Sequence, residues 1–471
     1  MRAILALLIV SVGATTAAAA EKPNVILILA DDMGWTDLGC TGSSFYETPR
    51  LDKLASEGML FTNAYAACPV CSPTRAALMT GRWPARVDIT DYIPGNRHGK
   101  LKPAPFKHEL PHEEVTIAEA MKQAGYATGM FGKWHLGGAG YLPDSQGFDE
   151  MGCGPNGRGF RSVDRADRLT DPALDFIERH RDEPFFLYLP HNLVHTPLLA
   201  KQELKSKYEE KAEQLPPPKG PRFRPEHSNE DRRVQDHPVY AAMMEDIDAN
   251  IGRVLDKLDA LNLRERTIVI FTSDNGGLST SEGSPTANTP LRAGKGWLYE
   301  GGLRVPLIVR WPGVVEPGST CDEAVTSTDY FPTVLAMCGL EQQPEWHRDG
   351  VNIVPLLKQA GPLEPRPLYW HYPHYGNQGG RPGSAVRQGD WKLIEFFEDN
   401  QVELYNLADD LEEQHDLASA QPEKARQLRE QLHAWRDSVN AKMPSPNPDF
   451  TGETYIPGKK PRKRANKGQK K

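Results

Sequence analysis

Two pairs of polar residues each follow an apolar run that is typical of a strand buried on both faces. Asp31-Asp32 follows residues 24–30 (NVILILA), and Asp274-Asn275 follows Ser273 after residues 267–272 (TIVIFT). In a parallel α/β sheet, ligands collect at the carboxyl ends of the strands, where adjacent carboxylates need a cation or hydrogen-bond donors. Three carboxylates and one amide oxygen suit Ca²⁺ or Mg²⁺. Either pair alone fits a turn or a helix cap equally well, but the two pairs together favour a metal site.

A second reactive group surrounds Cys71, in the string Cys68-Pro-Val-Cys71-Ser-Pro-Thr-Arg75. Ser72 is expected to cap a helix that starts at Pro73, which places Cys71 just outside the helix N-terminus. Such an end offers free N–H donors and partial positive charge, so it favours an anion such as sulfate or phosphate, and Arg75 can point to the same place. The simpler interpretation of a lone cysteine is a small buried hydrophobe. As half of a zinc site the CxxC spacing is weak, because no second CxxC or His-x-x-x-His follows.

Four further bases stand next to glycine or proline turns: Lys133, His135, His195 and Lys295. Each has an ordinary alternative. The lysines fit the surface, His135 fits a packed structural position beside Trp134, and His195 fits a turn before Pro197. All four are unlikely to be ordinary at once beside the acid pairs and the Cys71 string, so they are candidates for binding an anion and moving protons.

Alternating strands and helices must position these groups. Beyond the two runs above, strand-like runs lie at residues 126–131, 184–189 and 305–309. Residues 240–261 have helical apolar spacing, and a capping box at Thr116-Ile-Ala-Glu119 opens a helix that ends near Gly125. This order predicts an α/β fold with a large, mostly parallel or mixed sheet flanked by helices.

The chain of 471 residues is expected to divide into one large and one small unit behind an export signal. Residues 1–20 have the short positive start, apolar stretch and small-residue cleavage site of a signal peptide, with a retained anchor as the alternative. Residues 21–364 are expected to form the catalytic domain. Residues 365–445 are expected to form a small α+β subdomain, with antiparallel strands at 385–397 and 402–405 and a helix at 422–440. The expected location is therefore a periplasm or the exterior, with no transmembrane segment.

Residues 446–471 are expected to form a basic, disordered tail. Residues 459–471 contain eight Lys or Arg and no acid, whereas the whole chain has a net charge of −8. The acidic body argues against general nucleic-acid binding, and the tail is either simply solvated or in contact with polyanions. An exported chain could pair some of its six cysteines. If Cys71 is consumed chemically, at least one of the others stays free or pairs with another chain.

The string CSPTRAALMTGR at 71–82 resembles the signature of the type I sulfatases, in which the cysteine is oxidised to formylglycine. Thr74 stands where Ser is commoner in that family. The resemblance runs from about residue 22 to about residue 440 and includes further motifs in the family's order. These are ADDMGWTDLG at 30–39, GKWHLG at 132–137, HTP at 195–197, SDNGG at 273–277, GKGWLYEGGLRVP at 294–306 and ELYNLADDLEEQHDLA at 403–418.

The resemblance implies an alkaline-phosphatase-like fold and a role for each matching residue. Cys71 becomes formylglycine through a formylglycine-generating enzyme and lies at the metal, which is usually Ca²⁺, with Mg²⁺ possible. Arg75 holds residue 71 and the metal side of the site. The implied metal ligands are Asp31, Asp32, Asp274 and Asn275, the implied sulfate ligands are Lys133 and Lys295, and the bases that serve formylglycine and the leaving group are His135 and His195.

The chemistry that the resemblance implies is hydrolysis of a sulfate monoester. One hydroxyl of hydrated formylglycine attacks sulfur and displaces the alcohol, which His195 or Lys295 protonates. The second hydroxyl then loses a proton, to His135 in this interpretation, and sulfate leaves. The expected substrate is a sulfated carbohydrate rather than a small sulfate ester, held by loops at 88–98, 152–161 and 370–381. Two alternatives stay open: a formylglycine-dependent phosphonate or phosphodiester hydrolase, and a non-catalytic glycan-binding protein in which Cys71 is never oxidised.

Overall fold

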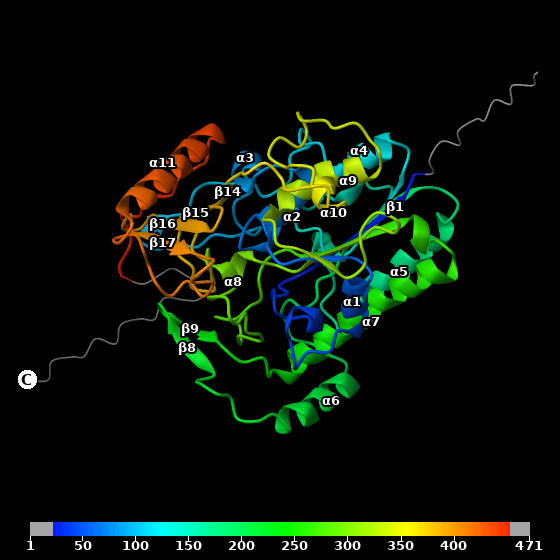
Figure 1. Ribbon diagram of the computed structural model, residues 1–471, viewed down its shortest axis with the longest axis horizontal. Coiled ribbons are helices and arrows are strands. Elements are labelled where there is room, and N and C mark those ends of the chain that lie inside the picture. Colours follow the sequence, from blue (N-terminus) through cyan, green and yellow to red (C-terminus); the bar gives the residue numbers. More distant parts are fainter. Residues whose placement is uncertain (1–21, 453–471) are drawn as a thin grey trace, which may run out of the picture.

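A mixed eight-stranded sheet runs through the centre of the computed structural model, which describes residues 22–452 (Figure 1). The expected signal peptide and residues 453–471 of the expected basic tail lie outside the described residues. The strands follow the order β12-β2-β11-β10-β1-β7-β5-β6. Their bounds are β1 (Asn24–Ala30), β2 (Met59–Phe61), β5 (Ala127–Phe131), β6 (Glu150–Gly152), β7 (Phe185–Pro190), β10 (Thr267–Ser273), β11 (Leu307–Arg310) and β12 (Ser319–Cys321).

All strands of this sheet except β11 run in the same direction. β1 pairs in parallel with β10 and β7, and the parallel pairing continues through β5 to β6. β11 is antiparallel to both of its neighbours, β10 and β2. The chain leaves β10 at the carboxyl edge of the sheet and enters β11 at the same edge, where Leu307 lies opposite Thr272. The connection between the two strands therefore does not cross to the amino edge of the sheet. The expectation of a mostly parallel or mixed sheet is confirmed.

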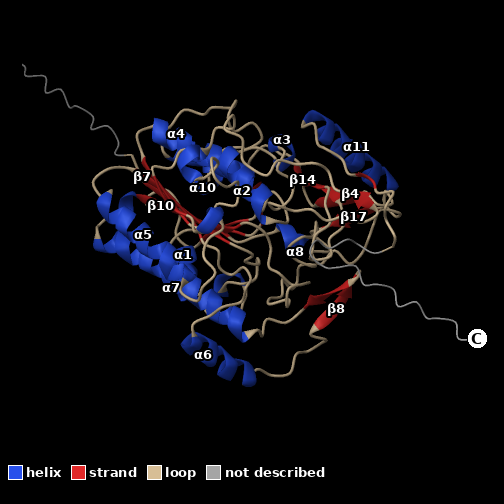
Figure 2. Ribbon diagram, turned by 180° about the vertical axis from the view of Figure 1, so that it is seen from behind, coloured by secondary structure: helices blue, strands red, loops and turns tan. Residues whose placement is uncertain are grey.

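Helices cover both faces of the sheet because alternate residues of β1 enter two different cores. Val25, Leu27 and Leu29 pack with one helix layer, whereas Ile26 and Ile28 pack with the other. Figures 1 and 2 show these two layers on opposite sides of the sheet. The first layer contains α2 (Cys71–Thr80), α4 (Ile117–Gln123), α9 (Tyr330–Met337) and α10 (Val354–Leu357). The second contains α1 (Pro49–Ser56), α5 (Arg165–Arg179), α6 (Gln202–Glu213) and α7 (Pro238–Ala260).

A four-stranded antiparallel sheet and a helix form the C-terminal part, as the sequence predicts. The elements are β14 (Leu368–Tyr372), β15 (Gly383–Gln388), β16 (Trp391–Phe396), β17 (Val402–Asn406) and α11 (Pro422–Ser438). β14 is an addition, because the first residues of the expected loop at 370–381 belong to this strand. Trp370 is buried there and its Nε1 donates to Ala66 O at 2.8 Å.

Buried charges join the C-terminal sheet to the main sheet's surroundings. Lys392 Nζ on β16 lies 2.9 Å from Glu300 Oε1 and 2.8 Å from Glu413 Oε1, and all three side chains are buried. Glu300 begins the single-turn helix α8 (Glu300–Leu303). The small sheet is therefore anchored to the segment that precedes β11.

The remaining elements are short. The Pro- and charge-rich stretch before α7 holds α6 and the hairpin of β8 (Phe223–Glu226) and β9 (Asn229–Arg232). Other short elements are β3 (Ala64–Tyr65), α3 (Pro84–Val87), β4 (Leu101–Lys102), β13 (Val325–Thr326) and β18 (Ser445–Pro446).

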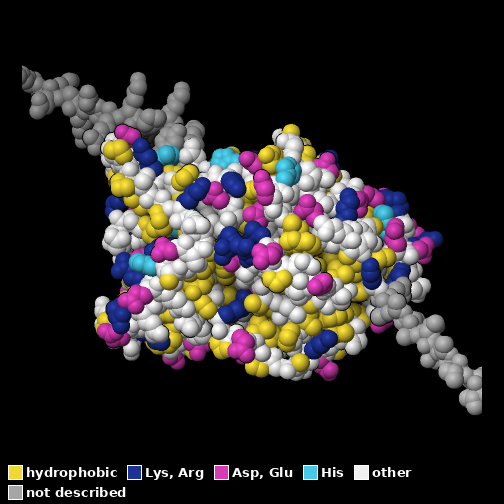
Figure 3. Space-filling model, turned by 90° about the horizontal axis from the view of Figure 1, so that it is seen from above, with side chains coloured by type: hydrophobic (Ala, Val, Ile, Leu, Met, Phe, Trp, Pro, Cys, Tyr) yellow, Lys and Arg dark blue, Asp and Glu magenta, His cyan; other side chains and the backbone are white. Residues whose placement is uncertain are grey.

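The state of the cysteines, the character of the helices and the surface charges bear on where the protein is expected to be located. All six cysteines are in the reduced form. Between residues 22 and 452, no helix combines the length and the apolar character that crossing a membrane requires. On the face that Figure 3 shows, Lys and Arg side chains are interspersed with Asp and Glu.

Candidate functional site

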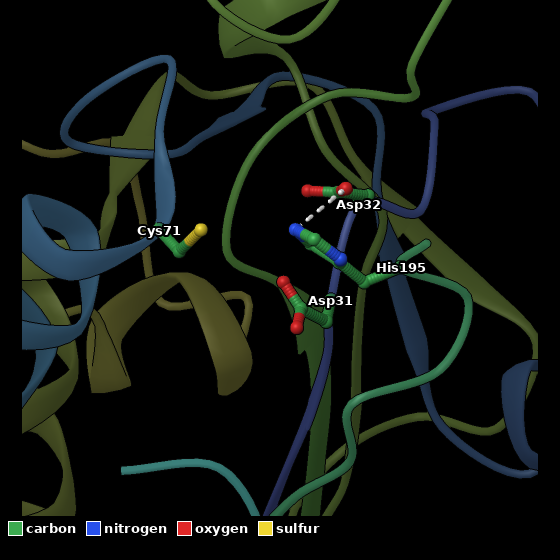
Figure 4. Close-up of side chains that lie close together, drawn as sticks. All are labelled: Asp31, Asp32, Cys71 and His195. Carbon is green, nitrogen blue, oxygen red and sulfur yellow. Dashed lines mark ion pairs between the residues drawn. The ribbon is translucent and has the colours of Figure 1, made fainter. Parts of the chain in front are cut away.

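The residues singled out from the sequence meet at the carboxyl edge of the main sheet. Asp31 and Asp32 follow β1, Asp274 follows β10, and Cys71 begins α2. Ligand atoms of Asp31, Asp32, Cys71 and His195 all lie within 4.8 Å of one another. In Figure 4 the sulfur of Cys71 points toward the group that the other three side chains form.

The register of the two central strands brings the acid pairs together. Ala30 lies opposite Ser273 in the parallel ladder, so both chains emerge side by side. The backbone N–H of Asp274 donates to Ala30 O at 3.1 Å, and that of Asp32 donates to Asp274 Oδ1 at 3.2 Å. Ser273 Oγ accepts from the N–H of Met33 at 3.0 Å. The three carboxylates are thus held against one another by the backbone, despite their mutual repulsion.

Each buried carboxylate has a cation from a different segment. Lys133 Nζ, after β5, lies 2.7 Å from Asp31 Oδ2. Lys295 Nζ lies 2.6 Å from Asp32 Oδ1 and 2.7 Å from Oδ2. The third pair is Arg75 with Asp274, in which Arg75 Nη2 lies 2.7 Å from Asp274 Oδ2. The charges balance in a water-poor environment where unpaired ions would be costly.

The pKa values of the acids reflect burial and these cations. Burial opposes ionisation of Asp31, but the charges of Lys133, His195, Arg75 and Lys295 together outweigh it and hold the pKa of Asp31 well below its usual value. Burial and repulsion from Asp31 raise the pKa of Asp274 to about 7, although Arg75 opposes this rise. The Asp274 carboxyl is therefore the member of the set that most needs additional positive charge to remain ionised.

Two oxygen atoms of the set have no hydrogen-bond donor. Asp31 Oδ1 and Asn275 Oδ1 are both buried without a hydrogen-bond partner, and Arg75 Nη2 lies 3.7 Å from Asp31 Oδ1. Asn275 Nδ2 donates to Asp32 Oδ1 at 2.9 Å, which fixes the amide and leaves its oxygen unsatisfied. Buried polar atoms are rarely left without partners, and unpaired oxygens next to carboxylates fit a hard divalent cation. The residues present can therefore hold Ca²⁺ or Mg²⁺.

The start of α2 differs from the sequence-based expectation. The helix begins at Cys71, with Val70 in the N-cap position and no side-chain cap, so the expectation that Ser72 caps it is wrong. Ser72 Oγ instead accepts from the N–H of Ile93 at 3.1 Å. Because α2 is buried along its whole length, the Ser72 hydroxyl packs against the loop around residue 93. Burial also raises the pKa of the Cys71 thiol to about 11.

The two histidines have different hydrogen-bond arrangements. His135 Nε2 lies 2.7 Å from Ile93 O, which can only accept, so Nε2 carries the hydrogen and Nδ1 is the unprotonated nitrogen. That Nδ1 is buried without a partner. His195 has the opposite arrangement, because its Nδ1 lies 2.6 Å from Thr196 O and its Nε2 lies 3.6 Å from Asp32 Oδ2. Burial and the neighbouring lysine charges lower the pKa of both imidazoles.

A cavity of about 210 Å³ opens above this set. Six of the expected residues line it: Asp31, Cys71, Lys133, His135, His195 and Lys295. The other four, Asp32, Arg75, Asp274 and Asn275, are buried but are not part of its wall. The geometry thus separates a cationic wall that an anion can reach from an acidic floor beneath it.

All three loops expected to hold the substrate contribute to the cavity, but through fewer residues than the sequence suggests. The loop at 88–98 supplies Tyr92, Ile93 and Pro94, the loop at 152–161 supplies Arg158 and Arg161, and the loop at 370–381 supplies Asn377 and Gln378. The aromatic and histidine residues at 370–374 are buried elsewhere instead.

Asn192, Thr196 and Glu282 also line the cavity, although none of them was predicted as a site residue. Asn192 stands two residues after the end of β7 at Pro190, so the strand-end rule that identified Asp31 could have found it. Glu282 has no such signal in the sequence. Its position at the cavity depends on a contact with a different loop, in which Thr196 Oγ1 donates to Glu282 Oε2 at 2.9 Å.

The chain is similar in sequence and in fold to known proteins. A family model described as Sulfatase matches residues 23–340, and one described as N-sulphoglucosamine sulphohydrolase, C-terminal, matches residues 293–439. A sulfatase of Formosa agariphila is 32% identical over 521 residues, which cover 89% of this chain and 90% of that protein. The N-acetylgalactosamine-6-sulfatase of Homo sapiens is 34% identical over 397 residues, which cover 76% of this chain and 70% of that protein. The crystal structure of Ps i-CgsB in complex with k-i-k-neocarrahexaose has a TM-score of 0.74 and 28% identity, and covers 92% of this chain and 95% of that chain.

Proposed function

The chain belongs to the sulfatase family and is a sulfuric ester hydrolase, and on this premise we propose that it removes sulfate from sulfated carbohydrates with a formylglycine formed from Cys71 and a divalent metal ion. One observation carries the proposal. Cys71 lies between a cavity wall of lysines and histidines and a buried floor of acids that has two unpartnered oxygens. A sulfate ester needs both features, because its negative charge must be screened before a nucleophile can approach.

The acidic floor is the proposed metal site, with Ca²⁺ preferred over Mg²⁺ as the ion. Asp31, Asp32, Asp274 and Asn275 would hold it beside residue 71, and the unpartnered Asp31 Oδ1 and Asn275 Oδ1 support this assignment. When bound, such a cation supplies positive charge that screens the sulfate ester and stabilises the charge of the transition state.

Conversion of Cys71 to formylglycine explains why a buried cysteine occupies this position. The pKa of the thiol, raised to about 11 by burial, leaves it protonated at neutral pH and weakly nucleophilic. The hydrated aldehyde supplies two hydroxyls on one carbon, so that one can attack and the other can release the product.

Lys133 and Lys295 are the proposed ligands of the sulfate oxygens. Both line the cavity, and each is bonded to a floor carboxylate. An ammonium has three donors, so each lysine can contact an anion in the cavity without giving up its carboxylate partner. Arg75 does not reach the cavity, and its proposed role is to hold Asp274 and the carbonyl of Lys133 in place.

The histidines are proposed to move protons at two different nitrogens. The unprotonated Nδ1 of His135 suits the acceptance of a proton from residue 71. Asp32 Oδ2 lies 3.6 Å from Nε2 of His195 and partly offsets the burial and the lysine charges that lower the pKa of this imidazole, so Nε2 is the proposed donor to the leaving oxygen. Lys295 is the alternative donor.

A sulfated carbohydrate is the proposed substrate because related proteins are named for such groups, including the N-acetylgalactosamine-6-sulfatase of Homo sapiens. The cavity is consistent with one sugar unit, since its volume of about 210 Å³ is smaller than pockets for drug-sized ligands. Export through the signal peptide at residues 1–20 and maturation by a formylglycine-generating enzyme are parts of the same proposal.

Two measurements on protein from its natural host test the proposal. Mass spectrometry of the peptide that contains residue 71 is expected to find formylglycine, and only unmodified thiol would favour the non-catalytic glycan-binding alternative. Paired kinetics are expected to give a higher kcat/KM for 4-nitrophenyl sulfate than for bis(4-nitrophenyl) phosphate. A strong preference for the phosphodiester would replace this proposal with the phosphodiesterase alternative.

A further inference from the structure

Two arginines of the loop at 152–161 line the cavity without forming an ion pair with an acidic side chain among residues 22–452. Arg158 and Arg161 are part of the same wall as Lys133, Lys295 and Cys71. Arg161 also borders an adjoining pocket that His195 and Leu198 line. Both arginines are exposed, so they form the part of the cavity wall that solvent reaches and toward which the rest of a substrate would extend.

Neither arginine has an acidic partner among residues 22–452. Arg158 Nη2 makes one long contact, 3.4 Å to Ile93 O, and Arg161 makes no hydrogen bond or ion pair in that range. Glu282 is the carboxylate that shares this part of the cavity, but its oxygens accept from Thr196 and Asn377 instead. The neighbouring Arg168, by contrast, stacks over Phe160 at 3.9 Å.

The loop that carries both arginines is fixed to the catalytic loops by its backbone. Gly157 O accepts from the N–H groups of Trp134 at 2.8 Å and His135 at 3.0 Å. Gly159 has a φ of +73°, and a Cβ there would lie 2.8 Å from side-chain atoms of Asn192, so only glycine fits. Asn192 Nδ2 also donates to Phe160 O. The backbone positions of Arg158 and Arg161 are therefore set relative to Lys133 and His135.

We infer that Arg158 and Arg161 form a second anion subsite, which binds a carboxylate or a further sulfate group on the same glycan as the sulfate that is removed. A guanidinium presents paired donors in the geometry of either group, and it stays charged at every physiological pH. The inference rests on the proposed function and narrows the class of substrate. The substrate class becomes sulfated glycans with a second acidic group near the scissile sulfate, rather than glycans with one isolated sulfate.

Binding to the Cys71→Ala variant tests the subsite without relying on turnover. Calorimetry would compare a disaccharide with one sulfate, the same disaccharide with a second sulfate, and one with a uronate carboxylate. The protein is expected to prefer at least one doubly acidic ligand over the monosulfated one. Adding R158Q and R161Q is expected to reduce that preference by roughly 10- to 100-fold, as loss of charge-assisted hydrogen bonds implies.

The control is R168Q, which removes a positive charge from the same region outside the cavity and is expected to keep the preference. Equal affinity for all three ligands in the Cys71→Ala protein, or an unchanged preference in the double arginine variant, would overturn the subsite. The uronate and disulfate arms identify which acidic group it takes. Failure of the proposed function is separate, because it appears as absence of sulfate release from 4-nitrophenyl sulfate by the wild-type protein.

Discussion

Arg75 donates two hydrogen bonds to a single oxygen of Asp274, Oδ2, from Nε at 3.0 Å and from Nη2 at 2.7 Å. Both side chains are fully buried. This leaves Asp274 Oδ1 to face Asp32, whose N–H it accepts. One carboxylate thus links the nucleophile helix to the acidic floor, and its two oxygens have separate tasks.

Removal of the Arg75 charge is expected to destabilise the whole protein. Arg75→Met leaves Asp274 buried without its cation, which typically costs about 3–5 kcal/mol. Urea unfolding followed by circular dichroism measures the loss. The control Arg426→Met breaks an exposed pair with Glu430 and is expected to leave the unfolding curve unchanged. Equal midpoints for the two variants would contradict the role assigned to Arg75.

Cys71→Ala is expected to abolish sulfate release while the fold stays intact. The alanine fits the start of α2, but no precursor of formylglycine remains. Release of 4-nitrophenol measures turnover, and thermal unfolding verifies the fold. The matched variant Cys68→Ala changes the other cysteine of the CxxC string, which lies outside the cavity wall, and is expected to stay modified at residue 71. Turnover by Cys71→Ala would exclude residue 71 as the nucleophile.

Calcium is expected to stabilise the chelator-treated protein, since a ligand that binds only the folded state raises its stability. At a concentration 100 times Kd the gain is about 2.7 kcal/mol. Differential scanning calorimetry with and without Ca²⁺ measures it, independently of activity. Asn275→Ala removes one unpartnered oxygen and is expected to weaken the effect. Asp246→Asn, a change in a buried acid paired with Lys201, is expected to retain it. An unfolding temperature that neither Ca²⁺ nor Mg²⁺ raises would argue against the metal site.

Asp91 is expected to make stability fall as pH rises between about 4 and 8. Burial raises the pKa of this carboxyl to about 8, although N–H of Tyr92 and the hydroxyl of Tyr372 donate to it. In the unfolded chain it titrates near about 3.9. Between these values the folded state holds a proton that the unfolded state has lost, so higher pH favours unfolding.

The variant Asp91→Asn isolates this effect, because its Oδ1 can accept the same two hydrogen bonds. Urea unfolding at pH 5 and pH 8 is expected to show the variant gaining stability relative to the wild type at the higher pH. His374, whose Nδ1 lies 3.8 Å from Asp91 Oδ2, also faces the carboxyl, and the charge of Arg97 acts on it as well. Parallel pH dependence of the two proteins would show that Asp91 is ionised in the folded state at pH 8.

Lys392→Met is expected to loosen the C-terminal sheet. The change leaves Glu300 and Glu413 buried together without the ammonium that separates their charges, again a loss of about 3–5 kcal/mol. Limited proteolysis would locate the damage, with early cleavage expected between residues 365 and 445. The control is Arg426→Met, which changes an exposed side chain of α11 that pairs with Glu423 and Glu430 of the same helix. A proteolytic pattern identical to that of the wild type would mean that the buried charges do not hold the two parts together.

The fold was largely predictable from the sequence because the central strands are continuous apolar runs. Residues 24–30 and 267–272 are buried on both faces, and a run without polar residues is what such burial requires. The reversed direction of β11 was not predictable, because an apolar run does not record which edge of a sheet it enters from. β14 was overlooked for a different reason: its aromatic residues resemble those of a sugar-binding loop, and their burial depends on the distant Ala66.

The acids and bases of the site were found through their positions at strand ends and in specific motifs. Their pairing was not predictable, because each contact joins segments far apart in the chain, as Lys295 and Asp32 do. The contacts at the entrance of the cavity were not predictable either. Glu282 lies outside every loop that was expected to hold the substrate, and only the folded chain brings it to Asn377.

The antiparallel direction of β11 keeps the whole connection from β10 at one edge of the sheet. Residues 274–306 therefore supply the floor through Asp274, the wall through Lys295 and the rim through Glu282, without the chain ever crossing the molecule. The antiparallel pairing of β10 with β11 holds both ends of this connection in place. Insertions or deletions near Glu282 would thus reshape the entrance while leaving the strand register and the acidic floor undisturbed, which makes this segment a natural place for specificity to diversify between related enzymes.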